Sequence, residues 1–461
     1  MLTIAAVAGQ TPGTNTAWKI ENHATRLVLG IQADSMMAEA AAVLQEDRPS
    51  RSQLWNFMPA GNRYKIVNLG SGELLGVERG SQAADAAIIQ TADTGTADHL
   101  WQFAESAGEY VKLTNVGSNL VLAAGPSNAA VQMPEGNSQE LWSLIASGPA
   151  YPDPLVVTGD TTVHDPSLIK TKQGTYYLFG THRGIPVSSS PDRIHFTSEG
   201  QAFAAIPEWV SAYSPNHDLW APDVSWRDGK YWLYYAASRF GSQISAIGLA
   251  ISSTAAPGSW SDQGMVIDSH DGSAWNAIDP GLVLDASGAP WLTFGSFWDG
   301  INLIRIDPST GKQSGRDRRT YPLAHRPASP AIEGAYIYPH QRYYYLFASF
   351  DQCCHGVRST YHIVVGRSST ITGPYIDRGG VAMALGGGTV LLSSHGRYIG
   401  PGGQTVIRDG SEDYLVYHYY DADASGAPAL GINQLTWDSA GWPHVCNSSP
   451  ATRVPAPSTL K

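Results

Sequence analysis

The sequence predicts an all-β protein with two repeat domains, and three observations support this prediction. The 461 residues include 48 Gly, 29 Pro, 14 Trp and 22 Tyr, while only 15% are charged. This composition is typical of short strands joined by tight turns. The other two observations are internal repeats, threefold near the N-terminus and fivefold over the remaining chain, and such periods indicate closed β architectures.

The overall composition excludes several classes of protein. The chain has 29 Lys+Arg against 40 Asp+Glu, a formal net charge of −11 and no basic run, so we expect no nucleic-acid partner. It lacks a run of about 18 apolar residues, so we expect no membrane-spanning helix. The three cysteines, Cys353, Cys354 and Cys446, are too few for a disulfide framework or a zinc cluster. The adjacent pair forms either a disulfide or two buried thiols, and the sequence leaves both open.

Residues 1–15 form an N-terminal segment outside the repeats. Its first part, Met1 to Gly9, is apolar but short and has no basic region, so it is not a complete signal peptide. Either a signal has been removed, or the chain is not exported by that route.

The threefold repeat covers residues 16–146. The repeats end alike and carry an Asn in equivalent opening strands, at Gln53-Leu54-Trp55, His99-Leu100-Trp101 and Glu140-Leu141-Trp142, with Asn22, Asn68 and Asn115. The tryptophans are 46 and 41 residues apart. Three units of about 45 residues that all read as strands predict a pseudo-threefold β domain.

These repeats resemble the ricin-type β-trefoil, also seen as carbohydrate-binding module family 13, whose repeats end in Gln-x-Trp. In that family an Asp just after the short Leu-rich strand usually holds sugar hydroxyls. The equivalent residues here are Gly30, Gly76 and Ala123, which have no side-chain acceptor. We therefore expect the three tryptophans to be core residues rather than sugar platforms. Sugar binding through Asp34 or Asn119 remains an alternative.

Residues 147–160 read as a short linker stiffened by proline. The fivefold repeat follows, over residues 161–461. Five aromatic strands recur, most of them after a turn that contains Gly, and they begin at Thr175, Lys230, Pro290, Arg342 and Asp413. Five all-β units at this spacing predict a five-bladed β-propeller, because the alternative β-sandwich gives no reason for five similar hairpins.

The strand before each aromatic hairpin holds the candidate catalytic residues. In a propeller the first strand of each blade lines the central axis. Aligned on the hairpins, these strands place five residues at one recurring position, Asp165, Ala221, Asp279, Glu333 and Gly402. Three carboxyl groups that converge in a cavity are costly unless they have a function. The alternative is that each caps a local turn, as Asp-Pro often does.

Converging carboxyl groups suit glycosidic bond hydrolysis. One protonated carboxyl group donates its proton to the leaving oxygen, and a second either attacks the sugar carbon or deprotonates a water. A third carboxylate nearby raises the pKa of the acid by repulsion between like charges.

The motifs around these residues resemble glycoside hydrolase family 43, a family of inverting five-bladed propellers. The motifs are His164-Asp165-Pro166, Trp220-Ala221-Pro222-Asp223, Ile278-Asp279-Pro280-Gly281 and Ile332-Glu333-Gly334. Within that family, Cys353-Cys354 with Ser359-Thr360-Tyr361, and Tyr398-Ile399-Gly400-Pro401-Gly402, are similar to the arabinanases. The resemblance implies that Asp165 is the general base, Glu333 the general acid, and Asp279 the residue that tunes and orients the acid.

Further residues are candidates for binding the substrate. Trp220 is expected to stack on a sugar in the cleft, and Trp298 is a candidate platform at a strand end. Asn276 and Ser296 are candidates for binding hydroxyl groups, with ordinary strand-end roles as the alternative. No cofactor is expected to be required.

A metal on the propeller axis is doubtful from the sequence. Arabinanases usually have a His just after Pro-Gly that binds a water-coordinated ion, whereas this chain has Gly403 there. His418 is the remaining candidate for a calcium site at the axis, and a hydrogen-bonded strand histidine is the alternative.

The resemblance implies an enzyme that cleaves α-1,5-linked L-arabinan by inversion, most simply in the endo mode. An exo-acting α-L-arabinofuranosidase or a β-xylosidase of the same family is the nearest alternative. A non-catalytic carbohydrate-binding protein is the alternative from another class, and nothing positive favours a scaffold or adhesion protein. The expected partner is arabinan, a plant cell-wall polysaccharide, and a polymeric substrate implies secretion.

Overall fold

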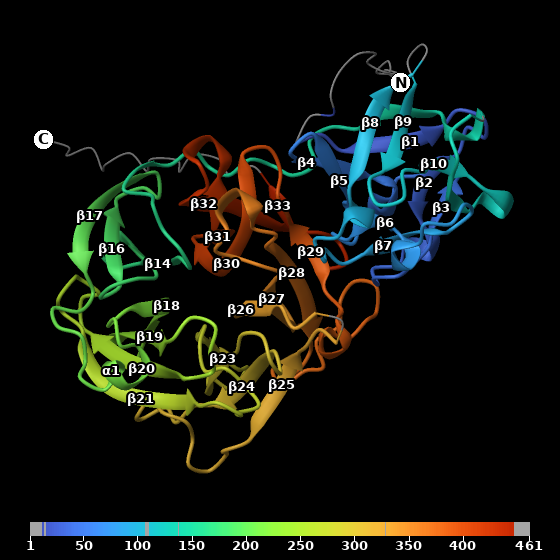
Figure 1. The fold of residues 1–461 in the computed structure, drawn as a ribbon. Helices are drawn as coiled ribbons and strands as arrows, with labels where there is room; N and C mark the ends of the chain where they lie inside the picture. The colour runs from blue at the N-terminus through green and yellow to red at the C-terminus, as the bar shows by residue number, and fades with distance from the viewer. Residues whose placement is uncertain (1–11, 13–14, 107–109, 137, 328, 447–461) are drawn as a thin grey trace, which may run out of the picture.

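The computed structural model describes residues 12, 15–106, 110–136, 138–327 and 329–446, which form two β domains side by side (Figure 1). The predicted N-terminal segment, residues 1–15, lies almost entirely outside the described residues. Within the described part of the chain, no helix has the length and apolar character needed to cross a bilayer.

The first domain is a β-trefoil of three four-stranded repeats. Its strands are β1 (Trp18–Asn22), β2 (Val28–Ile31), β3 (Ala42–Gln45), β4 (Trp55–Ala60), β5 (Arg63–Asn68), β6 (Leu74–Val77), β7 (Ile88–Thr91), β8 (Trp101–Glu105), β9 (Val111–Asn115), β10 (Val121–Ala124), β11 (Ala130–Met133) and β12 (Trp142–Ala146). The pairs β1–β12, β4–β5 and β8–β9 join the repeats, while β2–β3, β6–β7 and β10–β11 form hairpins.

The trefoil core confirms the prediction for the three repeat tryptophans. Trp55, Trp101 and Trp142 are fully buried, and each indole N–H donates to a backbone carbonyl in its own repeat. Buried indoles need such a partner, because an unpaired polar group in a core is costly. The equivalent residues Asn22, Asn68 and Asn115 are also fully buried, and each accepts two backbone N–H groups of the following turn.

The second domain is a five-bladed β-propeller (Figure 1). Its blades are β14 (Ser167–Lys170) to β17 (His195–Gln201); β18 (Leu219–Arg227) to β21 (Ser261–Ser269); β22 (Gly281–Leu284) to β25 (Thr320–Ala324); β26 (Ile332–His340) to β29 (Thr389–Leu392); and β30 (Tyr398–Asp409) to β33 (Pro443–Cys446). The inner neighbours within the blades are β15 (Tyr176–Phe179), β16 (Pro186–Ser190), β19 (Lys230–Ser238), β20 (Ser245–Ser252), β23 (Pro290–Phe294), β24 (Ile301–Arg305), β27 (Tyr343–Phe350), β28 (His362–Ser368), β31 (Glu412–Asp421) and β32 (Ala427–Trp437). The short helix α1 (Val210–Tyr213) connects the first two blades.

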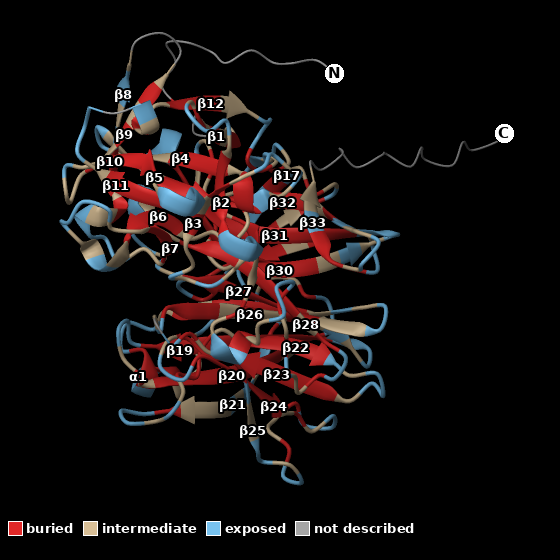
Figure 2. Cartoon of the chain, turned by 90° about the vertical axis from the view of Figure 1, so that its right-hand side faces the viewer, coloured by how far each residue is buried: buried red, intermediate tan, exposed pale blue. Residues whose placement is uncertain are grey.

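The first strands of the blades contact one another around the axis and close the ring. β14 contacts β18, β18 contacts β22, β22 contacts β26, β26 contacts β30, and β30 returns to β14. The five aromatic strands predicted from the sequence are the second strands of the blades, and most of their residues are buried (red in Figure 2). Aromatic and β-branched residues suit these strands because neighbouring blades pack on both faces.

The expected linker takes part in the propeller and in the contact between the domains. Thr158–Gly159 form strand β13, which pairs with β17 of the first blade. Tyr151 is buried in a cluster that joins Leu69 of the trefoil to Tyr345 and Leu392 of the fourth blade. The Nδ2 of Asn56 donates to the carbonyl of Ser394 across the interface. The trefoil therefore rests on blades four and five, at the rim of the propeller rather than over its axis (Figure 1).

Candidate active site

A pocket of about 710 Å³ opens at the propeller axis. Seven of the residues selected from the sequence line it, namely Asp165, Asp279, Glu333, Trp220, Asn276, Ser296 and Trp298. They come from the first, second, third and fourth blades, so the fold brings together residues that are up to 168 positions apart, between Asp165 and Glu333. A concave site with a few convergent polar groups is the usual form of a small-molecule or sugar site.

The structure corrects the predicted alignment of the five axial positions. In the first strand of each blade, regular pairing with the second strand begins either at the start of the strand or just after a β-bulge. The residues where it begins are Ser167, Asp223, Gly281, Tyr336 and Thr405. Two residues before each of them lie Asp165, Ala221, Asp279, Gly334 and Gly403, and all five have positive φ, between 43° and 62°. Glu333 and Gly402 therefore sit one residue earlier, at the position of His164, Trp220 and Ile278.

This difference has a physical cause. The left-handed conformation is open to Gly at little cost and strained for other residues. Blades four and five meet the requirement with Gly334 and Gly403, whereas Asp165 and Asp279 adopt it as non-Gly residues with φ of 46° and 58°. Strain of this kind is found where the surrounding structure fixes a functional geometry. The side chain of the candidate base Asp165 therefore extends from the position with positive φ, whereas that of the candidate acid Glu333 extends from the residue before the equivalent Gly334.

Asp165 is surrounded by groups that stabilise its charged form. Its Oδ2 accepts the hydroxyl of Thr181 at 2.6 Å and lies 2.9 Å from Nδ1 of His164. The backbone N–H of Ala221 donates to the same threonine oxygen, which fixes the direction of the hydroxyl. Burial alone would raise the pKa of Asp165, but His164, His418 and the Thr181 hydrogen bond together hold it below its usual range. Asp165 is therefore ionised at neutral pH.

The pKa of Glu333 is displaced in the opposite direction, upward. It is buried, with Ser296 donating to Oε2 at 2.5 Å and the Tyr361 hydroxyl donating to Oε1. Burial raises the pKa of Glu333, the two hydrogen bonds lower it, and the negative charge of Asp165 raises it again, with a net increase. The two carboxyl groups therefore have pKa values displaced in opposite directions, as acid and base pairs in active sites do.

Asp279 lies beside Glu333 and is tied to its backbone. Its Oδ2 accepts the N–H of Gly334 at 2.9 Å. Burial, followed by the charges of Glu333 and Asp165, raises the pKa of Asp279 well above its usual value. Glu333 and Asp279 thus form a coupled pair, in which the charge of Glu333 disfavours ionisation of Asp279.

The remaining candidates have separate surroundings. Trp220 is half-buried and donates to Asp218, and Asn276 is buried and accepts the hydroxyl of Ser245. Trp298 is 37% exposed at the pocket wall, which leaves its ring free for stacking. Ser296 faces Glu333 rather than open solvent, so its first contact is with the candidate acid.

Sequence reasoning missed several residues at the same site. Tyr361, which donates to Glu333, is part of the Ser359-Thr360-Tyr361 motif, whose sequence indicates the family and not a catalytic contact. Thr181 and Tyr420 had no distinguishing local pattern. Phe240, at a turn between β19 and β20, lines the pocket and is 81% exposed. An exposed aromatic in a Gly-containing loop is a signal that could have been used.

The residues at the axis do not fit a metal ion. His164, Asp165 and His418 place potential ligand atoms within 4.8 Å of one another. However, Nδ1 of His418 accepts the backbone N–H of Asp165 at 3.1 Å, and burial lowers the pKa of this histidine well below its usual value. Its proton therefore lies on Nε2, and neither ring nitrogen offers a free lone pair. Gly403 supplies no ligand, and a Cβ there would lie 2.5 Å from Oδ1 of Asp165. The hydrogen-bonded strand histidine, the alternative left open by the sequence, describes His418 better than a calcium ligand.

A five-bladed propeller with an axial pocket and converging carboxyl groups is typical of a glycoside hydrolase. The comparison with known families agrees, and the chain belongs to glycosyl hydrolases family 43, whose model matches residues 155–443. A model of the ricin-type beta-trefoil lectin domain matches residues 7–92, and the third repeat of the trefoil follows it in the structure.

Individual relatives match the propeller domain. The extracellular endo-alpha-(1->5)-L-arabinanase 1 of Bacillus subtilis is 46% identical over 288 residues, covering 61% of this chain and 87% of that protein. The extracellular exo-alpha-(1->5)-L-arabinofuranosidase of Cellvibrio japonicus is 40% identical over 300 residues, covering 61% and 86%. The solved endo-arabinanase of Bacillus licheniformis has a TM-score of 0.60 and 47% identity, covering 63% of this chain and 99% of that structure.

Proposed function

We propose that this enzyme hydrolyses α-1,5-L-arabinofuranosidic bonds in arabinan, with inversion at the anomeric carbon and cleavage within the chain. The observation that carries the proposal is the convergence of Asp165, Asp279 and Glu333 in one pocket at the propeller axis, and the pKa values of Asp165 and Glu333 are displaced in opposite directions there. The substrate assignment rests on the relatives, two of which are named endo-arabinanases.

The mechanism follows from the two carboxyl groups. Asp165, held ionised by His164 and Thr181, removes a proton from a water molecule as that water attacks the anomeric carbon. The bond between the anomeric carbon and the bridging oxygen breaks, and Glu333 donates its proton to that oxygen. Asp279 anchors the backbone at Gly334, and burial and the charge of Glu333 raise its own pKa, so the two carboxyl groups form a coupled pair.

Aromatic residues at the pocket provide surfaces for sugar rings. Trp298 and Trp220 line the same pocket as the carboxyl groups. A flat ring stacks on the C–H face of a sugar, and such contacts bury apolar area while leaving the hydroxyl groups solvated. We assign these two residues to substrate subsites.

We further infer that the enzyme acts outside the cell. Two of the relatives are named extracellular enzymes, and the proposed substrate is a polymer. The disulfide between Cys353 and Cys354 is consistent with an oxidising compartment.

Product analysis on linear arabinan tests the activity. The wild-type enzyme should release a ladder of short oligosaccharides, and Glu333→Gln should lose it, while the exposed control Glu208→Gln should behave as wild type. Release of arabinose alone would favour the exo mode suggested by the Cellvibrio japonicus relative. Activity only on xylan-derived substrates would move the assignment to a β-xylosidase, and inactivity on all of them would favour a carbohydrate-binding protein.

Proton NMR of the first products tests inversion. An inverting enzyme releases a new reducing end in the β configuration from an α-linked substrate, before mutarotation. Initial appearance of the α anomer would contradict the roles given to Asp165 and Glu333.

A further inference from the structure

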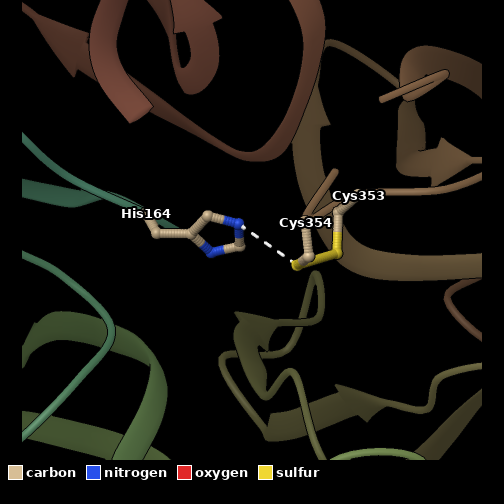
Figure 3. A group of neighbouring side chains, drawn as sticks. All are labelled: His164, Cys353 and Cys354. Atoms are coloured by element: carbon tan, nitrogen blue, oxygen red, sulfur yellow. Dashed lines mark hydrogen bonds between the residues drawn. A yellow bond between two sulfur atoms is a disulfide. The ribbon is translucent and has the colours of Figure 1, made fainter. Parts of the chain in front are cut away.

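The disulfide between adjacent residues Cys353 and Cys354 lies in the pocket wall, next to His164 (Figure 3). It belongs to the loop between β27 and β28 of the fourth blade. Its Sγ atom on Cys354 is 3.7 Å from Nε2 of His164, which precedes the first blade. The proposed mechanism gives this disulfide no task.

A chain of contacts connects the disulfide loop to Asp165. The backbone N–H of Cys354 donates to the hydroxyl oxygen of Tyr420 at 2.7 Å. The same oxygen lies 2.8 Å from Nε2 of His164, and Nδ1 of His164 lies 2.9 Å from Oδ2 of Asp165. Tyr420 is on β31, so blades four, five and one meet in this chain of contacts.

The chemistry of these groups gives the contacts a direction. Burial raises the pKa of Tyr420, so its hydroxyl keeps its proton. The Tyr420 oxygen accepts from Cys354, and its own proton has two acceptors in reach, Nε2 of His164 at 2.8 Å and Sγ of Cys354 at 3.9 Å; the shorter contact favours the histidine. The imidazole then carries its proton on Nδ1, which lies 2.9 Å from Oδ2 of Asp165 without the alignment of a hydrogen bond, so the two groups are in close polar contact. His164 is also held from the other side, since its ring stacks on that of His418 with centroids 3.8 Å apart.

The loop itself is tightly constrained. Cys354 has a φ of 67°, and the disulfide ring joins it to its neighbour, which limits the backbone rotations that would move its N–H. The N–H of His355 donates to Ser359, and a Cβ on Gly426 of blade five would lie 2.6 Å from the nitrogen of Val357. The direction of the Cys354 N–H is therefore fixed by covalent and packing contacts.

We propose that the Cys353–Cys354 loop is a positioning element for the general base, acting through Tyr420 and His164 on Asp165. The proposal rests on the role of Asp165 under the proposed function. It predicts that loss of the Tyr420 hydroxyl or of the disulfide lowers turnover and weakens the support for ionised Asp165, without removing the carboxylate itself.

Other charged and titratable groups also face Asp165. They are His418 from blade five, Glu333 and Tyr361 from blade four, Asp279 from blade three, and His182 from the first blade. All five remain in place when Tyr420 or the disulfide is altered, so a change in the pH profile reports on the His164 contact.

Kinetics of Tyr420→Phe test the proposal. We expect kcat on arabinan to fall about tenfold, KM to stay within about twofold, and the acidic limb of the pH profile of kcat to move to higher pH. The shift is upward because the pKa of Asp165 is lowered by His164, and a misplaced His164 lowers it less. Tyr419→Phe, on the adjacent residue of β31, is the matched control and should leave kcat and the limb unchanged.

The disulfide is tested in two ways. Cys353→Ser with Cys354→Ser should reproduce the fall in kcat and the shifted limb, and should add little when combined with Tyr420→Phe. If the double variant fails to fold, reduction of the wild-type enzyme with a phosphine should give the same changes, reversed by reoxidation. A rise in KM alone, with the acidic limb unmoved, would show that the disulfide is only a substrate wall and would overturn the proposal.

A measurement independent of activity separates this proposal from the proposed function. Long-range ¹⁵N NMR identifies the tautomer of each of the 14 histidines, and His164→Gln assigns the signal of His164. We expect the Nδ1–H tautomer in the wild type and its loss in Tyr420→Phe. An Nε2–H tautomer would overturn the relay even if arabinan is cleaved, whereas an inactive enzyme with the Nδ1–H tautomer would contradict only the proposed function.

Discussion

In the trefoil, equivalent positions of the three repeats hold residues with the same task, whereas in the propeller equivalent positions hold different residues. Trp55, Trp101 and Trp142 all fill the core and all donate to a carbonyl. The five axial positions with positive φ hold two Asp, one Ala and two Gly. Repetition is retained where it builds the fold, and it is lost where the axis needs chemically distinct groups.

The same contrast is seen in charged residues. Asp34 of the trefoil is bound by Arg48, Ser50 and Ser52, and these contacts hold its pKa near 2. The axial carboxyl groups have few cationic partners, and their pKa values diverge. A carboxylate that is satisfied locally stabilises structure, while carboxyl groups that perturb one another are typical of catalysis.

The largest expected effect on kcat is that of replacing the carboxyl groups at the propeller axis. Glu333→Gln should lower kcat on arabinan by about a thousandfold, because general acid catalysis contributes about 10²–10⁴. The loss should be much smaller on an arabino-oligosaccharide with a 4-nitrophenol leaving group, which needs little protonation. Asp165→Asn should lose activity on both substrates, since it removes the base. Equal losses of Glu333→Gln on the two substrates would contradict its role as acid.

A tryptophan in the trefoil should affect stability and not chemistry. Trp101→Ala removes a fully buried ring and should cost about 3–5 kcal/mol in the free energy of unfolding of the trefoil. The kcat on short arabino-oligosaccharides should remain at the wild-type value, because the axis is not touched. Denaturant unfolding and kinetics on the same sample measure the two quantities, and a parallel loss of both would show that the domains are coupled.

The matched substitution in the propeller should give the opposite result. Trp298→Ala removes a ring that is 37% exposed, so the free energy of unfolding should change by less than about 0.5 kcal/mol. The KM for arabinan should rise, because the ring faces the pocket. A stability loss as large as that of Trp101→Ala would place Trp298 in the core rather than at a subsite.

Much of the fold of both domains was predictable from the sequence, because similar residues recur at a regular spacing in each repeat. The core tryptophans and the aromatic second strands follow directly from that period. The alignment of Glu333 was wrong by one residue, because a bulge and a positive φ at Asp165 and Asp279 leave no sign in the residue types. The contacts of His164 with Tyr420 were not predictable, since they join residues 256 positions apart through the closure of the propeller.

A buried carboxyl group between blades two and three should make stability depend on pH. Burial raises the pKa of Asp223 to about 7, partly offset by the N–H of Leu282 that it accepts. A carboxyl group whose folded pKa is raised contributes stability below its unfolded pKa, and this contribution is lost as pH rises through the folded value. Between pH 5 and pH 8 the wild type should therefore lose on the order of 2 kcal/mol relative to Asp223→Asn.

Thermal unfolding at several pH values measures this difference. The exposed control Asp271→Asn should follow the wild-type profile. Identical profiles for Asp223→Asn and the wild type would show that Asp223 is ionised in the folded protein without cost.

The smallest expected effect concerns the trefoil and its remaining candidate for a sugar ligand. Asp34→Asn should weaken the ion pair with Arg48, which is about half-exposed and so contributes no more than about 1 kcal/mol. Adsorption to insoluble arabinan should not change, because the Asp34 oxygens are already occupied by Arg48, Ser50 and Ser52. At one of the family's usual sugar positions, a Cβ on Gly76 would lie 2.7 Å from Thr91, so an Asp side chain does not fit there. Loss of adsorption in Asp34→Asn, with kcat on short oligosaccharides intact, would instead make the trefoil a sugar-binding domain and would remove the contrast between the two halves of the molecule.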